Sequence, residues 1–294
     1  MADDLRVMDF GLETVIDRGI DRGSDRGVDR ASKPAGTQKT IRFEPTQRRL
    51  RVEVGGEWLV DTTRGMILIE SGHEPVYYFP RADVRFDLLQ ASSHTSHCPY
   101  KGKAAYWHVV LKDRRIENAV WGYPKPLATA PGHVAPTGPG GESLSEYVAF
   151  YWNKMDRWFE EDEEVFVHAR DPYKRIDSLA SKRRVEVVVG GEIIAASRDA
   201  IFLFETGLPV RYYLPRSDIR ADILADSAQQ TRCPYKGLAS YHRVVVNGID
   251  HGEIAWYYAE PIPETCRIKG RVAFYNEKVD AILLDGIAVP KLPG

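Results

Sequence analysis

The chain has 294 residues, a formal net charge of −2 and 43% hydrophobic residues. This length and composition predict two domains of ordinary size with a substantial core. The near-neutral charge gives no field to attract nucleic acid or an anionic membrane, so we expect neither as a partner. The start of the chain does not read as a secretory signal, and three widely spaced cysteines (Cys98, Cys233 and Cys266) do not form a disulfide framework. We therefore expect a cytoplasmic protein.

The first 40 residues differ in composition from the rest of the chain. Residues 15–31 read VIDRGIDRGSDRGVDRA, an Asp-Arg-Gly pattern with a period of four. Glycine at every fourth position disfavours a helix by about 1 kcal/mol each, and the apolar residues are too few to bury. We expect residues 1–40 to be a disordered tail. A nucleic-acid-binding arm is the alternative, but each arginine follows an aspartate that cancels its charge.

After this tail the chain carries one pattern twice. Two β-rich runs surround Gly-Gly-Glu at residues 55–57 and again at 190–192, which predicts a hairpin in each copy. Matching residues keep an offset of 135 positions as far as Pro126 and Pro261. "VAFYWNKMD" (148–156) then matches "VAFYNEKVD" (272–280) at an offset of 124. The first copy therefore contains an insertion of 11 residues, in a Pro- and Gly-rich stretch that indicates a loop.

This duplication predicts two homologous domains at 41–160 and 181–290, joined by a connector at 161–180. Val, Ile, Tyr, Phe and Trp dominate the predicted strands, and strands do not alternate with helices. The fold class is therefore mainly β: two small antiparallel β domains, each with about one short helix (DVRFDLLQAS and DIRADILADS). Because a tandem repeat often replaces a symmetric homodimer, we expect a monomer with two domains related by an approximate twofold axis.

Each copy contains the motif Cys-Pro-Tyr-Lys-Gly, at Cys98–Gly102 and at Cys233–Gly237. Proline fixes its own φ and glycine permits a tight turn, so we expect a rigid turn that presents tyrosine and lysine. Lys101 could lower the pKa of the neighbouring thiol and make it a nucleophile. A general base should then occur in both copies, but His97 corresponds to Arg232. A structural or ligand-contacting thiol is the competing interpretation.

Histidines near the first Cys-Pro-Tyr-Lys-Gly motif suggest a metal site. His94, His97 and Cys98 lie close together in the sequence, and His108 follows. A zinc site shared by both copies would need its ligands twice, yet the second copy has Arg243 in place of His108. We expect no metal and no cofactor.

Aromatic residues recur beside the lysine turn. Trp121 and Tyr123 lie two positions apart and therefore share one face of a strand. Such residues form either ordinary core or the wall of a pocket for a small flat molecule. A lysine buried near them should pair with a carboxylate, for which Glu70 and Glu205 are the candidates. The complete set of candidate ligand-binding residues is Glu70, Arg81, Cys98, Tyr100, Lys101, Tyr106, Trp121 and Tyr123, with Glu205, Arg216, Cys233, Tyr235, Lys236, Tyr241, Trp256 and Tyr258.

These motifs resemble the domain-of-unknown-function 427 family. The resemblance rests on the Gly-Gly-Glu hairpins, "PVYYFPRADV" and "PVRYYLPRSDI", Cys-Pro-Tyr-Lys-Gly followed by Ala-x-Tyr, "AVWGYPKP" and "EIAWYYAEP", and "VAFY". It covers about residues 45–160 and 180–290 and implies a compact β fold, often as a single copy or a tandem pair, without an established activity. A nucleotidyltransferase label is sometimes attached to the family. Such chemistry needs paired metal-binding carboxylates, which neither copy shows. The first copy departs by its insertion and by Gly122, where the second has Tyr257.

The leading hypothesis is that each repeat binds a small organic ligand, with an anionic end or a flat body, in a pocket lined by lysine and aromatic residues. One alternative is an enzyme that uses Cys98 and Cys233 as nucleophiles, or Glu70 and Glu205 as acid or base. Another is a structural or partner-binding module. Standard catalytic signatures, such as a phosphate-binding loop or a nucleophile elbow, do not occur in the sequence.

Overall fold

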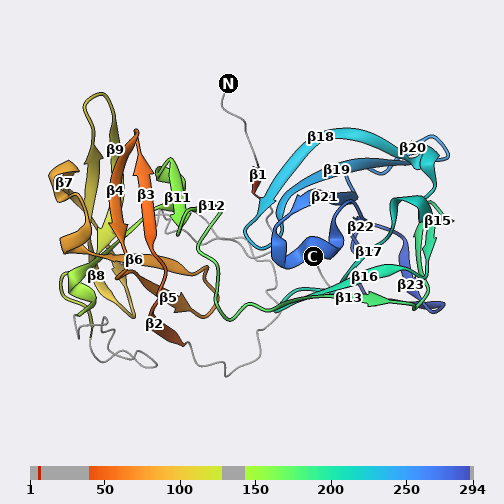
Figure 1. The fold of residues 1–294 in the computed structure, drawn as a ribbon, viewed down its shortest axis with the longest axis horizontal. Coiled ribbons are helices and arrows are strands. Elements are labelled where there is room, and N and C mark those ends of the chain that lie inside the picture. Colours follow the sequence, from red (N-terminus) through yellow and green to blue (C-terminus); the bar gives the residue numbers. More distant parts are fainter. Residues whose placement is uncertain (1–5, 8–39, 128–142, 292–294) are drawn as a thin grey trace, which may run out of the picture. The chain divides into compact units, whose positions relative to one another are not determined.

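A computed structural model describes residues 6–7, 40–127 and 143–291 of the chain. It divides between Asp171 and Pro172 into two compact units, each built mainly of β-strands (Figure 1). The helical turns in the described residues are all 3₁₀ turns, and none of them could cross a membrane. The mainly β class predicted from the sequence is confirmed.

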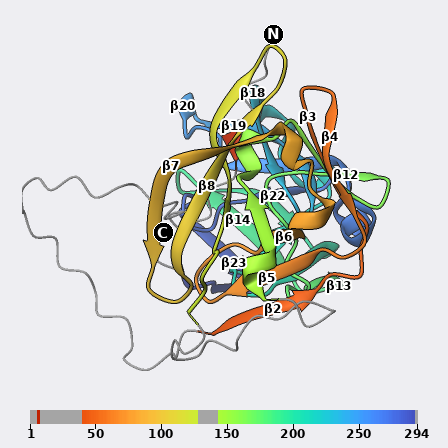
Figure 2. The same ribbon diagram turned by 90° about the vertical axis from the view of Figure 1, so that its left-hand side faces the viewer.

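The first unit contains a seven-stranded and a four-stranded antiparallel sheet. The seven-stranded sheet has the order β2 (Ile41–Pro45), β5 (Met66–Glu70), β6 (Val76–Pro80), β10 (Tyr147–Phe150), β9 (Arg115–Gly122), β8 (Gly102–Val110) and β7 (Leu89–Cys98). The four-stranded sheet has the order β12 (Glu163–Val165), β11 (Arg157–Glu160), β3 (Leu50–Val54) and β4 (Glu57–Thr62). Figure 2 shows β7 and β8 as a long curved ribbon.

The second unit repeats this order strand for strand. Its larger array is β13 (Ile176–Ser181), β16 (Ala200–Glu205), β17 (Arg211–Tyr213), β22 (Val272–Phe274), β21 (Ala255–Pro261), β19 (Gly237–Val246) and β18 (Leu224–Cys233), with a Leu214–Val272 bridge joining β17 to β22. The smaller sheet is β24 (Ile287–Ala288), β23 (Ala281–Leu284), β14 (Val185–Val189) and β15 (Glu192–Ser197). Two further strands, β20 (Ile249–Asp250) and β1 (Arg6–Val7), pair with β19 and β18. The internal duplication therefore extends to the strand order.

The Gly-Gly-Glu hairpins predicted from the sequence are present. Gly55 and Gly56 join β3 to β4 with φ values of +59° and +78°. Gly190 and Gly191 join β14 to β15 with φ values of +61° and +77°. Two consecutive positive φ values define the tight turn that matches the twist of a hairpin, and glycine adopts them without steric cost.

The helical segment expected in each copy is divided between 3₁₀ turns and a strand. Asp83 and Asp218 end one 3₁₀ turn, Phe86–Leu88 and Ala221–Ile223 form another, and β7 and β18 begin directly afterwards. Pairing with β8 and β19 holds the residues of β7 and β18 extended, because ladder hydrogen bonds outweigh the weak helix preference of a short segment. The remaining 3₁₀ turns are Arg81–Asp83, Leu144–Glu146, Trp152–Lys154, Arg216–Asp218 and Pro263–Ile268.

Two segments were expected to lie outside the β domains, namely the tail and the connector. The tail prediction for residues 1–40 falls almost entirely outside the described residues, apart from Thr40 and the two residues of β1. Residues 161–180, expected to be a connector, contain β12 and most of β13. Each of these strands pairs within its own unit, and residues 166–175 between them join the two units.

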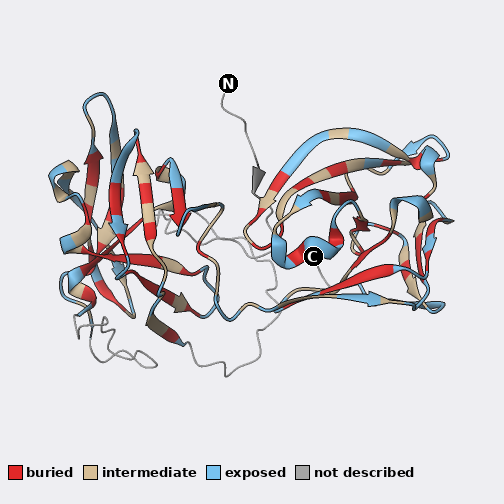
Figure 3. Ribbon diagram, viewed as in Figure 1, coloured by how far each residue is buried: buried red, intermediate tan, exposed pale blue. Residues whose placement is uncertain are grey.

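The larger sheet of each unit has a different core on each face. In the first unit, one face packs against the smaller sheet through residues such as Val52, Phe79 and Val120. The opposite face carries an aromatic core that includes Tyr78 and Tyr106. Tyr78 and Phe79 are adjacent on β6, so strand alternation sends them to opposite faces. Figure 3 shows the buried residues concentrated along the strands of both units.

Candidate functional site

The Cys-Pro-Tyr-Lys-Gly turn connects β7 to β8 and reappears between β18 and β19. Gly102 has a φ of +99°, and a Cβ atom there would lie 3.1 Å from the carbonyl oxygen of Lys125. Gly237 repeats this, with a φ of +100° and 3.3 Å to the carbonyl oxygen of Glu260. Both the backbone angle and the close approach require glycine. The glycine therefore fixes the backbone of the turn, and with it the position from which the preceding lysine side chain extends.

Each of these lysines pairs with a buried glutamate. Lys101 Nζ lies 2.5 Å from Glu70 Oε2, and the two side chains are only 10% and 6% exposed. Lys236 pairs with Glu205 in the same way, with side-chain exposures of 5% and 4%. The pairing predicted from the sequence is therefore present in both repeats. The glutamate ends β5 or β16, near one edge of the larger sheet, whereas the lysine follows the strand at the opposite edge. The ion pair thus links two distant parts of a curved sheet.

The charge of Glu205 is stabilised by two lysines. Lys174 Nζ lies 2.9 Å from Oε1, and Lys236 donates to Oε2. Burial alone would raise the pKa of Glu205, but the two ammonium groups outweigh it and hold the pKa below its usual value. Glu205 is therefore ionised at neutral pH, which makes it unsuited to act as a general acid. In the first repeat, His73 Nε2 lies 3.5 Å from Glu70 Oε1.

The aromatic residues behind this pair have matching geometry in both repeats. Trp256 meets Tyr213 edge to face, with ring centroids 6.2 Å apart, and stands 4.3 Å from Tyr275. Its indole N–H donates to the Tyr213 hydroxyl at 3.1 Å. In the first repeat, Trp121 lies 6.4 Å from Tyr78 and 4.5 Å from Tyr151. The duplicated sequence has therefore kept a duplicated arrangement of rings.

A small hollow lies against the ion pair of the second repeat. Its volume is about 10 Å³, which admits one water-sized group. The lining residues are Glu205, Leu208, Pro209, Arg211, Tyr213, Lys236 and Trp256. Four of these, namely Leu208, Pro209, Arg211 and Tyr213, were not among the sequence candidates. Tyr213 could have been found, because it matches Tyr78 at the same offset of 135. Arg211 could not, because the corresponding residue is Val76.

The structure does not bring all sequence candidates to the site. Arg81 lies over the rings of Phe86 and Trp107, at 4.5 and 5.0 Å, and these rings pack on the core between the sheets. The structure therefore does not bring Arg81 to the Lys–Glu pair. Arg81 follows Phe79 by two residues, and Phe79 belongs to the same core between the sheets. Its counterpart Arg216 is exposed and does not line the hollow.

Other candidates lie behind the site, in the aromatic core. These residues are Cys98, Tyr100, Tyr106 and Tyr123 in the first repeat, and Tyr241 and Tyr258 in the second. Lys101 Nζ lies 5.9 Å from the ring of Tyr123, and Lys174 Nζ lies 4.9 Å from the ring of Tyr235. The hydroxyl of Tyr258 is buried without a hydrogen-bond partner among the described residues.

The two thiols differ in burial. Cys98 is half-buried and Cys233 is buried. His97 neighbours Cys98 on β7, and strand alternation directs the two side chains to opposite faces of the sheet. The nearest imidazole along the chain is thus badly placed to activate the thiol. The geometry favours a packing role for both cysteines over a nucleophilic one.

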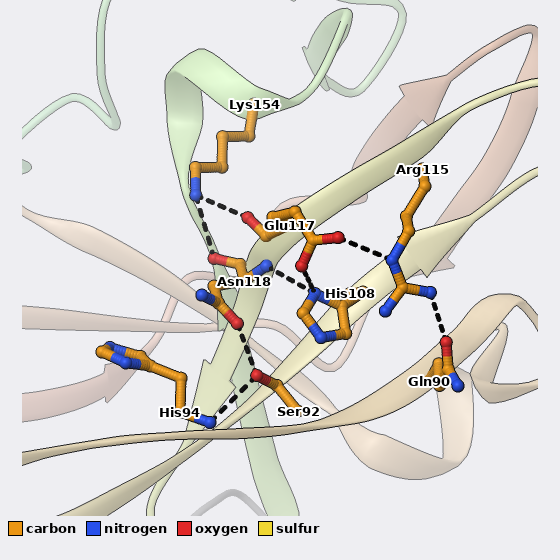
Figure 4. Close-up of polar contacts among 8 residues, drawn as sticks. All are labelled: Gln90, Ser92, His94, His108, Arg115, Glu117, Asn118 and Lys154. Carbon is orange, nitrogen blue, oxygen red and sulfur yellow. Dashed lines mark hydrogen bonds and ion pairs between the residues drawn. The ribbon is translucent and has the colours of Figure 1, made fainter.

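Two of the histidines that suggested a metal site, His94 and His108, lie in a separate polar cluster (Figure 4), His94 through its backbone N–H. His108 Nδ1 lies 2.5 Å from Glu117 Oε2 and 3.1 Å from the backbone nitrogen of Asn118. Ser92 donates to the Asn118 side chain at 2.6 Å and accepts the backbone N–H of His94. In Figure 4, Ser92 and Asn118 separate the two histidines. Within the described residues, no group of three or more His, Cys, Asp or Glu is placed to hold a metal ion.

The sequence matches the model of one protein family twice, over residues 42–161 and 177–285. That family is described as a domain of unknown function, DUF427. The chain belongs to this family. No curated protein matches it. The two matched segments correspond to the two units of the fold, so each DUF427 repeat contains one larger sheet, one smaller sheet and one Lys–Glu pair.

Proposed function

We propose that each DUF427 repeat binds the polar end of a small organic ligand at its Lys–Glu pair, beneath the adjoining tryptophan. The observation that carries this proposal is the hollow of the second repeat, which Lys236, Glu205 and Trp256 line together. Its size suits a single polar atom of the ligand rather than its whole body. The body of the ligand would then lie outside, against Leu208 and Pro209, which are partly exposed.

The hydrogen-bonding capacity of the lysine supports this proposal. An ammonium group has three N–H donors. Lys236 makes its hydrogen bond within the described residues to Glu205, and Lys101 makes its bond to Glu70. Two donors on each nitrogen therefore remain for an acceptor atom of a ligand, or for the water that occupies its place.

The energetics of buried charges also favour a binding role. A buried ion pair gains little net stability over apolar residues of similar volume, because the loss of hydration offsets the attraction. Stability alone therefore gives a weak reason for a Lys–Glu pair at the same place in both repeats. Ligand binding gives a stronger reason, because the ligand can use the charge of a lysine that the glutamate holds in a buried position.

The proposal can be tested separately in the two repeats through their tryptophans. Trp256 is the single tryptophan of residues 172–294, and Trp121 occupies the matching place in the first repeat. In the ¹⁵N-labelled full chain, the indole N–H signals are assigned with Trp121→Phe and Trp256→Phe. A panel of small aromatic acids, amines and neutral amides is then titrated. We expect at least one compound to shift one of the two signals in a saturable manner.

Matched lysine variants control this experiment. Lys236→Met should abolish a response at Trp256 and leave a response at Trp121 intact, and Lys101→Met should do the reverse. Methionine keeps an unbranched side chain of similar length while it removes the charge. Because each change also takes one lysine away from a buried carboxylate, near-ultraviolet circular dichroism must show that both variants are folded. If no compound shifts either indole, or if shifts persist unchanged in both methionine variants, the proposed function is wrong.

A further inference from the structure

The two Lys–Glu sites differ in their charged groups. In the second repeat, Lys236, Lys174 and Arg211 meet the carboxylates of Glu205 and Glu277, a net charge of +1. The positions of the first repeat that match the lining of the hollow hold Glu70, Glu74 and Lys101, with no arginine. The difference arises because Pro209 corresponds to Glu74 and Arg211 to Val76. A ligand that suits one site is therefore poorly matched to the other.

Arg211 is held firmly in place beside the hollow. Its two terminal nitrogens donate to the two carboxylate oxygens of Glu277, both at 2.9 Å. Its guanidinium also lies over the rings of Trp256 and Tyr275, at 5.7 and 5.5 Å. The side chain is only 11% exposed. A guanidinium fixed in this way is preorganised, so a ligand does not have to immobilise it.

The groups around the hollow donate more hydrogen bonds than they accept. Lys236 keeps two N–H donors, as described above. Tyr213 uses its hydroxyl oxygen to accept the Trp256 N–H, which leaves its own proton to donate. Each terminal nitrogen of Arg211 has a second N–H besides the one directed to Glu277. Such a set matches a carboxylate, which only accepts hydrogen bonds.

We infer that the second repeat binds the carboxylate of a small organic acid beside Arg211 and Lys236, with one carboxylate oxygen in the hollow, and that the first repeat does not. This inference rests on the proposed function, because it assigns a ligand class to one of the two proposed sites. Arg211 and Glu277 together determine the specificity. The first repeat has Val76 and Asn153 at their positions and so has no fixed guanidinium.

Benzoate and benzamide provide a direct test, because they share shape and differ in charge. The full chain is titrated with each while the indole signals of Trp256 and Trp121 are recorded. We expect benzoate to shift the Trp256 signal with an affinity at least about tenfold higher than that of benzamide. The Trp121 signal should show no such preference. Inorganic phosphate, which is tetrahedral and lacks a flat body, should bind at Trp256 more weakly than benzoate.

The first repeat supplies the matched variant. Arg211→Val with Glu277→Asn copies Val76 and Asn153, and it removes the ion pair as a whole so that no charge is left unpaired. It should lower the benzoate affinity about tenfold or more. Near-ultraviolet circular dichroism confirms that the variant is folded. The single change Arg211→Gln gives a milder second measurement in the same direction.

The outcomes separate this inference from the proposed function. If benzamide binds at Trp256 as tightly as benzoate, if phosphate binds as tightly as benzoate, or if the double variant keeps the wild-type affinity for benzoate, the carboxylate assignment is wrong. In those cases the general ligand site stands as long as some compound shifts the signal in a manner that depends on Lys236. If benzoate fails to bind while a neutral or cationic compound binds at Trp256, the inference alone is overturned.

Discussion

The two DUF427 repeats have the same strand order, the same glycine turn and the same Lys–Glu pair, yet they differ in the residues that surround this pair. The second repeat places Arg211 and Lys174 near Glu205. The first has Val76 in place of Arg211, with His73 beside Glu70. Away from this pair, the first repeat has a polar cluster around His108, which is Arg243 in the second.

This contrast separates what the fold requires from what can vary. Features present in both repeats connect parts of the sheet that are distant along the chain. The lysine turn, for example, reaches the glutamate at the end of β5 or β16. Residues that differ between the repeats, such as Arg211 and Val76, occur at matching positions near this ion pair, and the strand order is the same with either residue. Substitutions in the first group should therefore affect stability, and substitutions in the second group should affect ligand choice.

The largest effect is expected from removing the glutamate alone. Glu205→Leu leaves Lys236 and Lys174 near a buried apolar group, and it should destabilise the second repeat by about 3–5 kcal/mol. The double change Glu205→Leu with Lys236→Met should recover most of this loss, because no buried charge is then unpaired. Hydrogen exchange of the full chain measures each repeat through separate peptides. A double variant as unstable as the single one would contradict this account.

A smaller loss is expected from the glycine of the lysine turn. Gly102→Ala places a Cβ atom 3.1 Å from a backbone oxygen at a positive φ, and it should cost about 1–3 kcal/mol in the first repeat. Gly237→Ala, at 3.3 Å, should cost slightly less in the second. Gly56→Ala is the control, since its φ is also positive but no atom lies within 4 Å. Equal losses for all three variants would show that the close approach has no effect.

Acid should weaken the second repeat through Glu205. Its pKa in the folded protein lies below the unfolded value of about 4.3, so the ionised group stabilises the fold above that pH. This contribution is lost as the pH falls through the folded pKa. The difference in unfolding free energy between wild type and Glu205→Gln should therefore shrink below about pH 4.3. Hydrogen exchange at a series of pH values tests this, and a difference that stays constant would contradict it.

The smallest effect is expected at Tyr258. Because its buried hydroxyl has no hydrogen-bond partner among the described residues, Tyr258→Phe should be neutral or stabilising by up to about 1 kcal/mol. Tyr213→Phe is the contrast, since it removes the acceptor of the Trp256 N–H and should cost about 1–3 kcal/mol. Thermal unfolding followed by circular dichroism compares the two. A loss above 1 kcal/mol for Tyr258→Phe would indicate that a bound water or ligand occupies that position.

Several features of the fold could be predicted because they depend on local or repeated sequence. Gly55 and Gly56 identify a hairpin because the tight turn needs two positive φ values. The pairing of Lys101 with Glu70 could be inferred because a lysine among aromatics needs an opposite charge. The short helical segment expected in each copy contains a 3₁₀ turn, Phe86–Leu88 or Ala221–Ile223. In the first repeat, pairing with β8 begins at Leu89 and holds the rest of the segment extended, and this pairing is not visible in the local sequence.

The sequence by itself determined that this chain is a duplicated β protein with one glycine turn and one lysine–glutamate pair in each copy. Only the tertiary structure decided which other charged side chains lie beside that lysine–glutamate pair. Arg81 recurs as Arg216 and seemed part of the site, but its guanidinium lies over Phe86 and Trp107, which pack on the core between the sheets. Arg211 has no counterpart and was overlooked, but β17 places it beside Lys236, 25 residues further along the chain. The reason is physical: the curvature of the sheet determines which distant residues meet, and curvature is a property of the assembled strands.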